Sequence, residues 1–289
     1  MYKRQGYPWI YSNEIISDRR TKSLLPGSFC TLIDYNKNPI CLVTVNPNSK
    51  IFARVMDYNL DTIINAYWLK DKISKALAKR KEIFRDPFYR LVNAEADELP
   101  GLIVDRFDNV IVMQPNAFWA ENMSEIIANS IKEVCSIDVV IKNASGRSRR
   151  LEGLDDKNSV FFGDLPEAAI SVPMNGAIYK ADVHEGQKTG LFYDQRQNHK
   201  FVASLANGKT VLDVFCHVGG FGLAAIAAGA SKVSFVDSSA NALDLVREGA
   251  SEMMASSKMN IIRGDAFSVL RKLLESDNSY DICLLYTSP

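Results

Sequence analysis

Three aspartates follow three apolar segments in the C-terminal half of the chain, where charged side chains could contact a ligand. Asp213 lies in "KTVLDVF", Asp237 ends "KVSFVD", and Asp265 follows "IIRG". Carboxylates accept hydrogen bonds from hydroxyl and amino groups and attract cations. Any one of these acids is explained about equally well as a helix N-cap. Their succession after three strands favours a single ligand site.

A glycine-rich turn adjoins the first of these acids. In "DVFCHVGGFGLAA", Gly219, Gly220 and Gly222 lie between a predicted buried strand and a predicted apolar helix. Glycines allow a sharp turn and a close approach of the backbone to a ligand. Asp213 at the entrance would repel the pyrophosphate of a dinucleotide, which argues against NAD. It would attract the ammonium and sulfonium groups of S-adenosylmethionine.

The other two acids then correspond to other parts of S-adenosylmethionine. Asp237 can accept hydrogen bonds from both ribose hydroxyls, and Asp265 can accept one from the adenine amino group, with Ala266 beside the ring. Cys216 and His217 within the turn are weaker catalytic candidates, because no paired acid or base accompanies them. No cluster of ligand-spaced residues predicts a metal site.

The N-terminal half contains three segments with different sequence patterns. Residues 26–58 alternate short apolar strands with turn residues, which is typical of a small antiparallel barrel. Residues 60–84 place apolar residues at helical spacing and predict a long amphipathic linker helix with a cationic face. From residue 90 to 143, strands surround a Leu-Pro-Gly turn and a helical segment, so we expect an α+β middle domain.

From about residue 180, strands and helices alternate. This alternation predicts a parallel, doubly wound α/β sheet of the Rossmann-like kind. The expected strands are residues 211–215, 232–236, 260–262 and 280–285. The predicted domains are residues 1–68, residues 69–179, and residues 180–289.

Composition narrows the class of protein. The 289 residues carry a formal net charge of zero, which argues against binding nucleic acid through a basic tail and leaves local patches. The five cysteines are scattered and include no C-x-x-C pair, so we expect the reducing cytoplasm and no disulfide framework. No segment is apolar over the ~20 residues of a membrane span.

Four strings resemble one family in the same order. They are "GYPWIYSNEI" with "NPNSKIFARV", then "LVNAEADELPGLIVDRFDN", "HEGQKTGLFYDQRQNH" and "VLDVFCHVGGFGLAAIAAGASKVSFVDSS". The chain resembles the large-subunit ribosomal RNA methyltransferase I family of S-adenosylmethionine-dependent RNA cytosine-C5 methyltransferases. The resemblance implies an N-terminal RNA-binding PUA barrel, S-adenosylmethionine as cofactor and ribosomal RNA as partner. We expect no membrane partner, and we consider a homodimer.

The resemblance and the motifs together give the candidate residues. Expected at the cofactor are Lys188, Thr189, Gln195, Arg196, Asp213, Phe215, Gly219, Gly220, Phe221, Asp237, Ser238, Asp265 and Ala266. Expected at RNA are Arg4, Trp9, Arg147 and Arg149, in which aromatic faces and arginines suit exposed bases. The alternatives are a solvated capped helix around Gln195, a core position for Trp9, and a solvated charge run at residues 147–150.

The resemblance fails near residue 289. Tyr286, Thr287 and Ser288 stand where the family has an acid and two prolines. In the family a cysteine thiolate adds to C6 of cytosine and makes C5 nucleophilic, and we expect that catalytic residue beyond residue 289, in a longer protein. Two other functions stay open. One is an RNA-binding protein with a non-catalytic S-adenosylmethionine domain, and the other is an NAD-dependent oxidoreductase.

Overall fold

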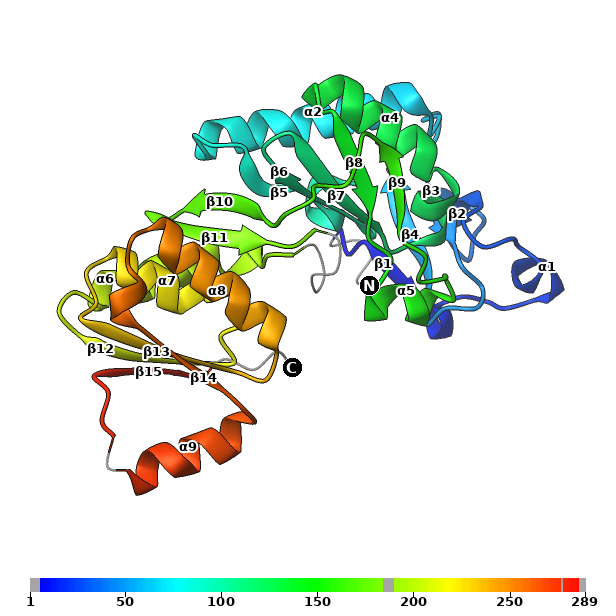
Figure 1. Cartoon of the computed structure of the whole chain (residues 1–289). Coiled ribbons are helices and arrows are strands. Elements are labelled where there is room, and N and C mark those ends of the chain that lie inside the picture. Colours follow the sequence, from blue (N-terminus) through cyan, green and yellow to red (C-terminus); the bar gives the residue numbers. More distant parts are fainter. Residues whose placement is uncertain (1–5, 184–189, 277, 286–289) are drawn as a thin grey trace. The chain divides into compact units, whose positions relative to one another are not determined.

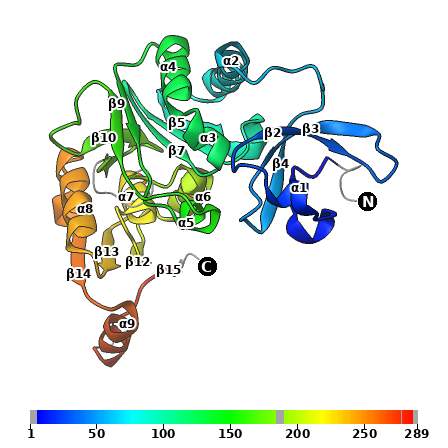
Figure 2. The ribbon, with the colours of Figure 1, turned by 90° about the vertical axis from the view of Figure 1, so that its right-hand side faces the viewer.

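A computed structural model describes residues 6–183, 190–276 and 278–285. The chain forms two compact units, Met1–Leu165 and Pro166–Pro289, which are described separately (Figures 1 and 2). The first unit holds an N-terminal β-domain and a mixed α/β domain. The second holds a β-hairpin and a parallel sheet with its helices.

The N-terminal β-domain is a four-stranded antiparallel sheet in the order β1-β4-β3-β2. All four strands contribute side chains to one apolar core around Ile10, Val43 and Phe52, as expected for a small barrel. Its elements are β1 (Trp9–Tyr11), η2 (Ser12–Glu14), α1 (Arg19–Lys22), β2 (Phe29–Ile33), β3 (Pro39–Val45) and β4 (Ile51–Asp57).

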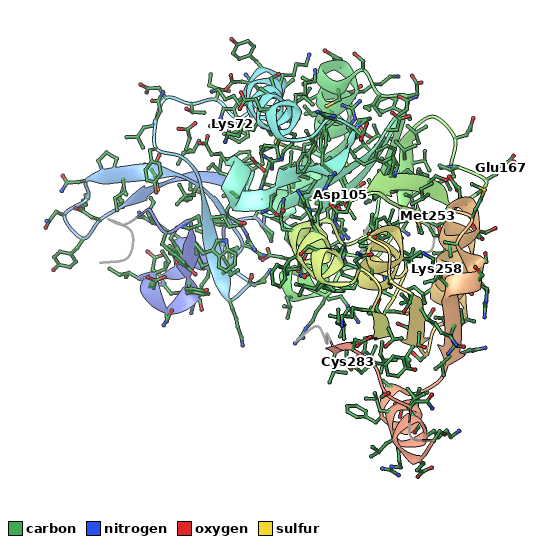
Figure 3. The ribbon with its side chains drawn as sticks, turned by 90° about the vertical axis from the view of Figure 1, so that its left-hand side faces the viewer. Lys72, Asp105, Glu167, Met253, Lys258 and Cys283 are labelled. Atoms are coloured by element: carbon green, nitrogen blue, oxygen red, sulfur yellow. The ribbon has the colours of Figure 1, made fainter. Side chains whose placement is uncertain are left out.

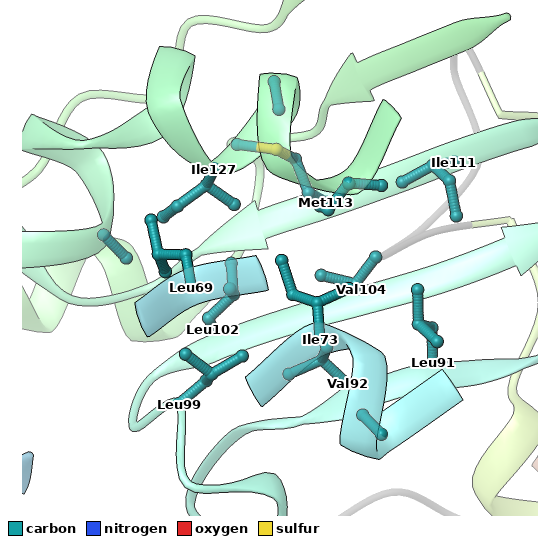
Figure 4. Packing of buried hydrophobic residues seen from close by; sticks show 14 of the residues in the cluster. Leu69, Ile73, Leu91, Val92, Leu99, Leu102, Val104, Ile111, Met113 and Ile127 are labelled. Atoms are coloured by element: carbon teal, nitrogen blue, oxygen red, sulfur yellow. The ribbon is translucent and has the colours of Figure 1, made fainter. Parts of the chain in front are cut away.

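The middle domain is a five-stranded sheet in the order β5-β6-β7-β8-β9, in which only β7 and β8 are parallel. Helices α2 and α4 cover one face, and Leu69 and Ile73 of α2 pack against Val92 and Val104 of the sheet (Figure 4). The elements are α2 (Ala66–Ile83), β5 (Phe88–Asn93), η3 (Ala94–Asp97), β6 (Leu102–Phe107), β7 (Val110–Pro115), α3 (Phe118–Asn122), α4 (Ser124–Cys135), β8 (Val139–Lys142), α5 (Arg147–Glu152) and β9 (Ser159–Phe162).

The helix predicted over residues 60–84 is shorter and is not a linker. It begins after Asn65, whose side chain accepts a hydrogen bond from the Trp68 N–H at 3.0 Å. An asparagine satisfies a free N–H of the first turn in this way and fixes the start of a helix. Trp68 and Leu69 are buried in the middle-domain core, so α2 is part of that domain.

A buried carboxylate connects the β-domain to the middle domain. Glu152, at the end of α5, accepts hydrogen bonds from the side chains of Asn46 at 2.9 Å, Ser49 at 3.0 Å and Arg54 at 2.7 Å. A buried charge is tolerated when it is paired and hydrogen-bonded, as here. The two domains therefore form one compact unit.

The second unit contains a four-stranded parallel sheet in the order β14-β13-β12-β15. This is the 3-2-1-4 order of a doubly wound fold, as the alternation predicted. Its elements are β10 (Ile170–Met174), β11 (Ala177–Ala181), η4 (Tyr193–Gln195), α6 (Arg196–Leu205), β12 (Thr210–Val214), α7 (Gly220–Ala227), β13 (Lys232–Asp237), α8 (Ala240–Glu252), η5 (Ser256–Lys258), β14 (Met259–Arg263), α9 (Ala266–Glu275) and β15 (Ile282–Leu285).

The β10–β11 hairpin belongs to the second unit. Gly249 of α8 lies so close to it that an added Cβ would be 2.6 Å from the carbonyl oxygen of Ile178. The predicted boundary near residue 180 placed this hairpin with the middle domain, whereas it packs on the helices of the sheet that follows. The three-domain division remains a prediction. In the described part of the chain, no helix combines the length and apolar character needed to cross a bilayer.

Candidate functional site

The turn after β12 has an unusual backbone. Phe215, His217 and Gly219 adopt φ values of 58°, 51° and 78°, in the left-handed region. Phe215 and His217 carry side chains, so this conformation is strained for them. Backbone strain of this kind is concentrated at functional sites. The N–H of Cys216 donates to the carbonyl of Val236 at 3.1 Å, so the turn is anchored to the end of β13.

Asp213 is buried in β12, immediately before this turn. Its Oδ2 accepts a hydrogen bond from the N–H of Gly222 at 2.8 Å, and 2% of the residue is exposed. Burial raises the pKa of this carboxyl to about 7, and the negative charge of Asp237 adds to the rise. Among the described residues no basic side chain forms an ion pair with it. The site would therefore favour a cationic ligand.

Packing explains two of the glycines. A Cβ on Gly220 would lie 2.6 Å from the imidazole of His199, and one on Gly222 would lie 2.1 Å from the ring of Phe235. Both glycines therefore admit neighbouring side chains, and the sequence interpretation of them as ligand contacts missed this. At Gly219 a positive φ is the requirement, because glycine adopts it without strain.

His199 is not among the candidate residues of the sequence, but it supports the turn. It is 3% exposed, lies between Tyr179 and Phe221, and burial lowers its pKa to about 4, so it is neutral at pH 7. The hydroxyl of Tyr179 donates to the Gly220 carbonyl at 3.1 Å. Through these contacts, His199 of α6 and Tyr179 of β11 support the first turn of α7. No sequence pattern connects segments so far apart.

Asp237 lies at the carboxyl end of β13, next to the turn. Its Oδ2 accepts from the His217 N–H at 2.9 Å, and its Oδ1 accepts from the Ser239 N–H at 2.9 Å. An ionised carboxylate has about four acceptor sites, and the described residues fill two of them, so two can accept from hydroxyl groups. The structure thus fixes this carboxylate beside the glycine turn, and its role at a ribose remains a prediction. Ser238 is exposed beside it.

Asp265 is the N-cap of α9, which confirms the capping alternative. Its Oδ1 accepts from the Ser268 N–H at 2.9 Å, and this backbone hydrogen bond lowers the pKa of the carboxyl. The residue is exposed, so capping does not prevent a further contact. Ala266 is buried, and the exposed ring of Phe267 lies 6.3 Å from that of Phe215.

The segment before the sheet is described in part. Lys188 and Thr189 lie outside the described residues. Gln195 ends η4, and its Oε1 accepts from the Asn198 side chain at 2.8 Å. Arg196 begins α6, and its carbonyl accepts from the Asn175 side chain at 2.8 Å. Their roles at the cofactor remain predictions.

The residues expected to contact RNA differ in how exposed they are. Arg4 lies outside the described residues, and Trp9 is partly buried, with its Nε1 donating to Glu95 at 2.7 Å. Arg147 is exposed on α5. The prediction is wrong for Arg149, which is fully buried and donates to the Pro115 carbonyl and to the carboxylates of Glu121 and Asp155. This arginine anchors α5.

The cysteines of the second unit do not provide an activated thiol. Burial raises the pKa of Cys216 far above its ordinary value, and neighbouring Asp213 and Asp237 add to the rise. Burial also raises the pKa of Cys283, which lies on the edge strand β15 (Figure 3). A reactive thiolate needs the opposite shift. Across the described ranges, no three His, Cys, Asp or Glu side chains are grouped to hold a metal ion.

Comparisons with known proteins agree on one family. Residues 3–58 match a PUA-like domain, and residues 149–278 match an S-adenosylmethionine-dependent methyltransferase domain. The chain is 31% identical over 283 residues to ribosomal RNA large subunit methyltransferase I of Shewanella frigidimarina, covering 96% of this chain and 71% of that protein. The chain belongs to this methyltransferase I family. The corresponding protein of Shewanella denitrificans is 30% identical with the same coverage.

Solved structures share the fold. A structure from Streptococcus mutans, described as a SAM-dependent methyltransferase, has a TM-score of 0.84 at 18% identity and covers 98% of this chain and 73% of that one. Another, a methyltransferase complexed with SAH, has a TM-score of 0.85 at 18% identity, covering 98% of this chain and 72% of that one. As a member of the methyltransferase I family, the chain is an S-adenosylmethionine-dependent methyltransferase. In the described part of the chain, Asp213 is buried without an ion pair and Asp237 has two acceptor sites beyond its two backbone hydrogen bonds, and both features fit that cofactor.

Proposed function

We propose that this methyltransferase acts on large-subunit ribosomal RNA and methylates cytosine at C5. The observation that carries the site is the fixed carboxylate of Asp237 beside the strained turn after β12, which suits the ribose of S-adenosylmethionine. The names of the relatives support the ribosomal substrate. The sequence resemblance supports cytosine C5. A ribosomal substrate also supports a cytoplasmic location, and the homodimer stays a prediction.

In this proposal each part of the second unit has a separate task. Bound S-adenosylmethionine supplies a methyl group on a positively charged sulfur. Asp213 stabilises positive charge at the turn, Asp237 holds the ribose, and Ala266 with Phe215 borders the base. In the first unit, Arg147 and the β-domain contact the phosphates and bases of the RNA. NAD is disfavoured, because its pyrophosphate would meet the carboxylate of Asp213.

The direct test is methyl transfer from radiolabelled S-adenosylmethionine to unmodified large-subunit ribosomal RNA, followed by nucleoside analysis, with a protein that also carries the catalytic cysteine expected beyond residue 289. We expect the label in 5-methylcytidine. Label in another nucleoside would remove the C5 assignment while keeping the methyltransferase. Titration calorimetry with S-adenosylmethionine and with NAD tests the cofactor separately, and tighter binding of NAD would contradict the proposed site.

Asp237→Asn is expected to weaken S-adenosylmethionine binding by about 1.5–3 kcal/mol, because a hydrogen bond to a charged acceptor is lost or becomes neutral. Isothermal titration calorimetry measures the change. Asp244→Asn is the matched control, because Asp244 is an exposed acid of the same unit that pairs with Arg247 on the surface of α8. If Asp237→Asn binds as tightly as the control, the ribose assignment is wrong.

A further inference from the structure

The tip of the β2–β3 hairpin is exposed and yet tightly held. The N–H of Asp34 donates to the Asn38 carbonyl at 2.9 Å, and the N–H of Lys37 donates to the Asp34 carbonyl at 3.0 Å. The Asp34 carboxylate accepts from the side-chain amide of Asn38 at 3.1 Å and from its backbone N–H at 2.8 Å. These bonds, the side-chain one first, lower the pKa of Asp34. The three-residue loop between these two residues is therefore preorganised.

Lys37 occupies the strained position of this loop. A three-residue hairpin loop of this type ends in a left-handed residue, which is usually glycine. Here Lys37 takes that position with φ 64°. The tip of the β10–β11 hairpin has Asn175 and Gly176 with φ 55° and 78°, and the β6–β7 hairpin has Asp108 with φ 56°, and these residue types adopt the left-handed region more readily than lysine. A residue that breaks a local rule without a packing reason is most often found at a functional site.

The side chain of Tyr35 lies in solvent at the tip of this hairpin. The residue is 89% exposed, and in the described part of the chain its side chain makes no hydrogen bond or ring contact. Asn36 and Lys37 beside it are also exposed. A large aromatic ring held out in water on a rigid turn does not contribute to a core. It does provide a flat face for stacking, next to an amide and an ammonium group.

We propose that this hairpin tip, residues 35–37, binds single-stranded RNA. Tyr35 stacks on one unpaired base, Asn36 hydrogen-bonds to a base edge, and the ammonium group of Lys37 pairs with a phosphate. Proteins recognise single-stranded RNA with this combination of groups, whereas the bases of a duplex are stacked on each other and closed to an aromatic side chain. This inference rests on the proposed RNA substrate and adds a specific contact to it.

The first experiment measures binding of the full chain to a fluorescein-labelled 12-nucleotide RNA of mixed sequence and to a duplex of the same length. Tyr35→Ala is expected to weaken single-strand binding by about 5- to 100-fold, the effect of losing one stacked base. Tyr35→Phe keeps the stacking face and should bind within about twofold of the native chain. Tyr67→Ala is the matched control, because Tyr67 is 82% exposed on α2 of the same unit.

The second experiment uses Lys37→Gly, which should leave thermal stability unchanged or raise it while lowering RNA affinity. Glycine removes the backbone strain, so the midpoint of thermal unfolding should stay or rise. RNA affinity should nevertheless fall, and the salt slope should become shallower by about 0.7, the value for one phosphate contact on a single strand. Unchanged affinity in Lys37→Gly would overturn the inference.

The remaining outcomes separate this inference from the proposed function. If the native chain binds RNA and Tyr35→Ala binds equally well, the hairpin contact is overturned while the RNA substrate stands. The same conclusion follows if Tyr35→Ala weakens duplex and single-strand binding equally, because stacking would not explain that loss. If the native chain binds neither RNA, the RNA substrate and the hairpin contact fail together.

Discussion

Gly222→Ala is expected to destabilise the parallel sheet of the second unit by about 1–3 kcal/mol or more, although alanine is the better helix former. The new Cβ would lie 2.1 Å from the ring of Phe235, which is fully buried on β13. It would also displace the Gly222 N–H, which donates a hydrogen bond to Asp213. Hydrogen exchange of the β12 and β13 amides measures the loss locally, without assuming that the two units unfold together.

Two further variants test the reason for this loss. Phe235→Leu in the Gly222→Ala background should recover part of the protection, because the smaller side chain gives the Cβ room. Gly146→Ala is the matched control, since its Cβ would be 3.6 Å from the nearest atom, the Oδ1 of Asn116. A Gly222→Ala protein that keeps native protection would show that the ring of Phe235 moves aside at low cost.

The order of the strands could be predicted from the sequence, because apolar periodicity and alternation are local properties of the chain. The parallel sheet appears with the predicted strands shifted by one or two residues. The capping role of Asp265 could also be predicted, because a cap depends on the residues that follow it. Local signals therefore identified the acids and placed them at the ends of the strands.

What surrounds those residues could not be predicted in the same way. Gly220 has no side chain because His199 lies against it from another helix, and no pattern within the turn encodes that contact. Arg149 is in a basic run that reads as solvated, but partners from β7, α3 and the loop after α5 bury its guanidinium. Non-local packing decided both cases. The structure therefore showed that candidates such as Arg149 hold the fold.

Asp213 is expected to lower the stability of the second unit as the pH rises from about 4 to about 7. His199 of the same unit contributes the opposite slope up to about pH 6.5, because burial lowers its pKa to about 4. In the unfolded chain the Asp213 carboxyl has its ordinary pKa of 3.8, whereas burial raises it to about 7 in the folded protein. Over this interval the folded state binds more protons at Asp213, so this group's contribution to the free energy of unfolding decreases by up to about 1.4 kcal/mol per pH unit. In urea titrations at several pH values, the difference in stability between Asp213→Asn and the native chain should therefore change in favour of the variant as the pH rises from about 4 to about 7.

The same carboxyl should make cofactor binding depend on pH in the opposite direction. A positively charged ligand stabilises the ionised form, so the affinity for S-adenosylmethionine should rise up to about pH 7 and then level off. Binding below that pH should release a proton, which calorimetry in buffers of different ionisation enthalpy detects. Asp244→Asn should retain both effects, and Asp213→Asn should lose both. If Asp213→Asn keeps the proton release, another group is responsible, and Asp213 only supports the N–H of Gly222 in the turn.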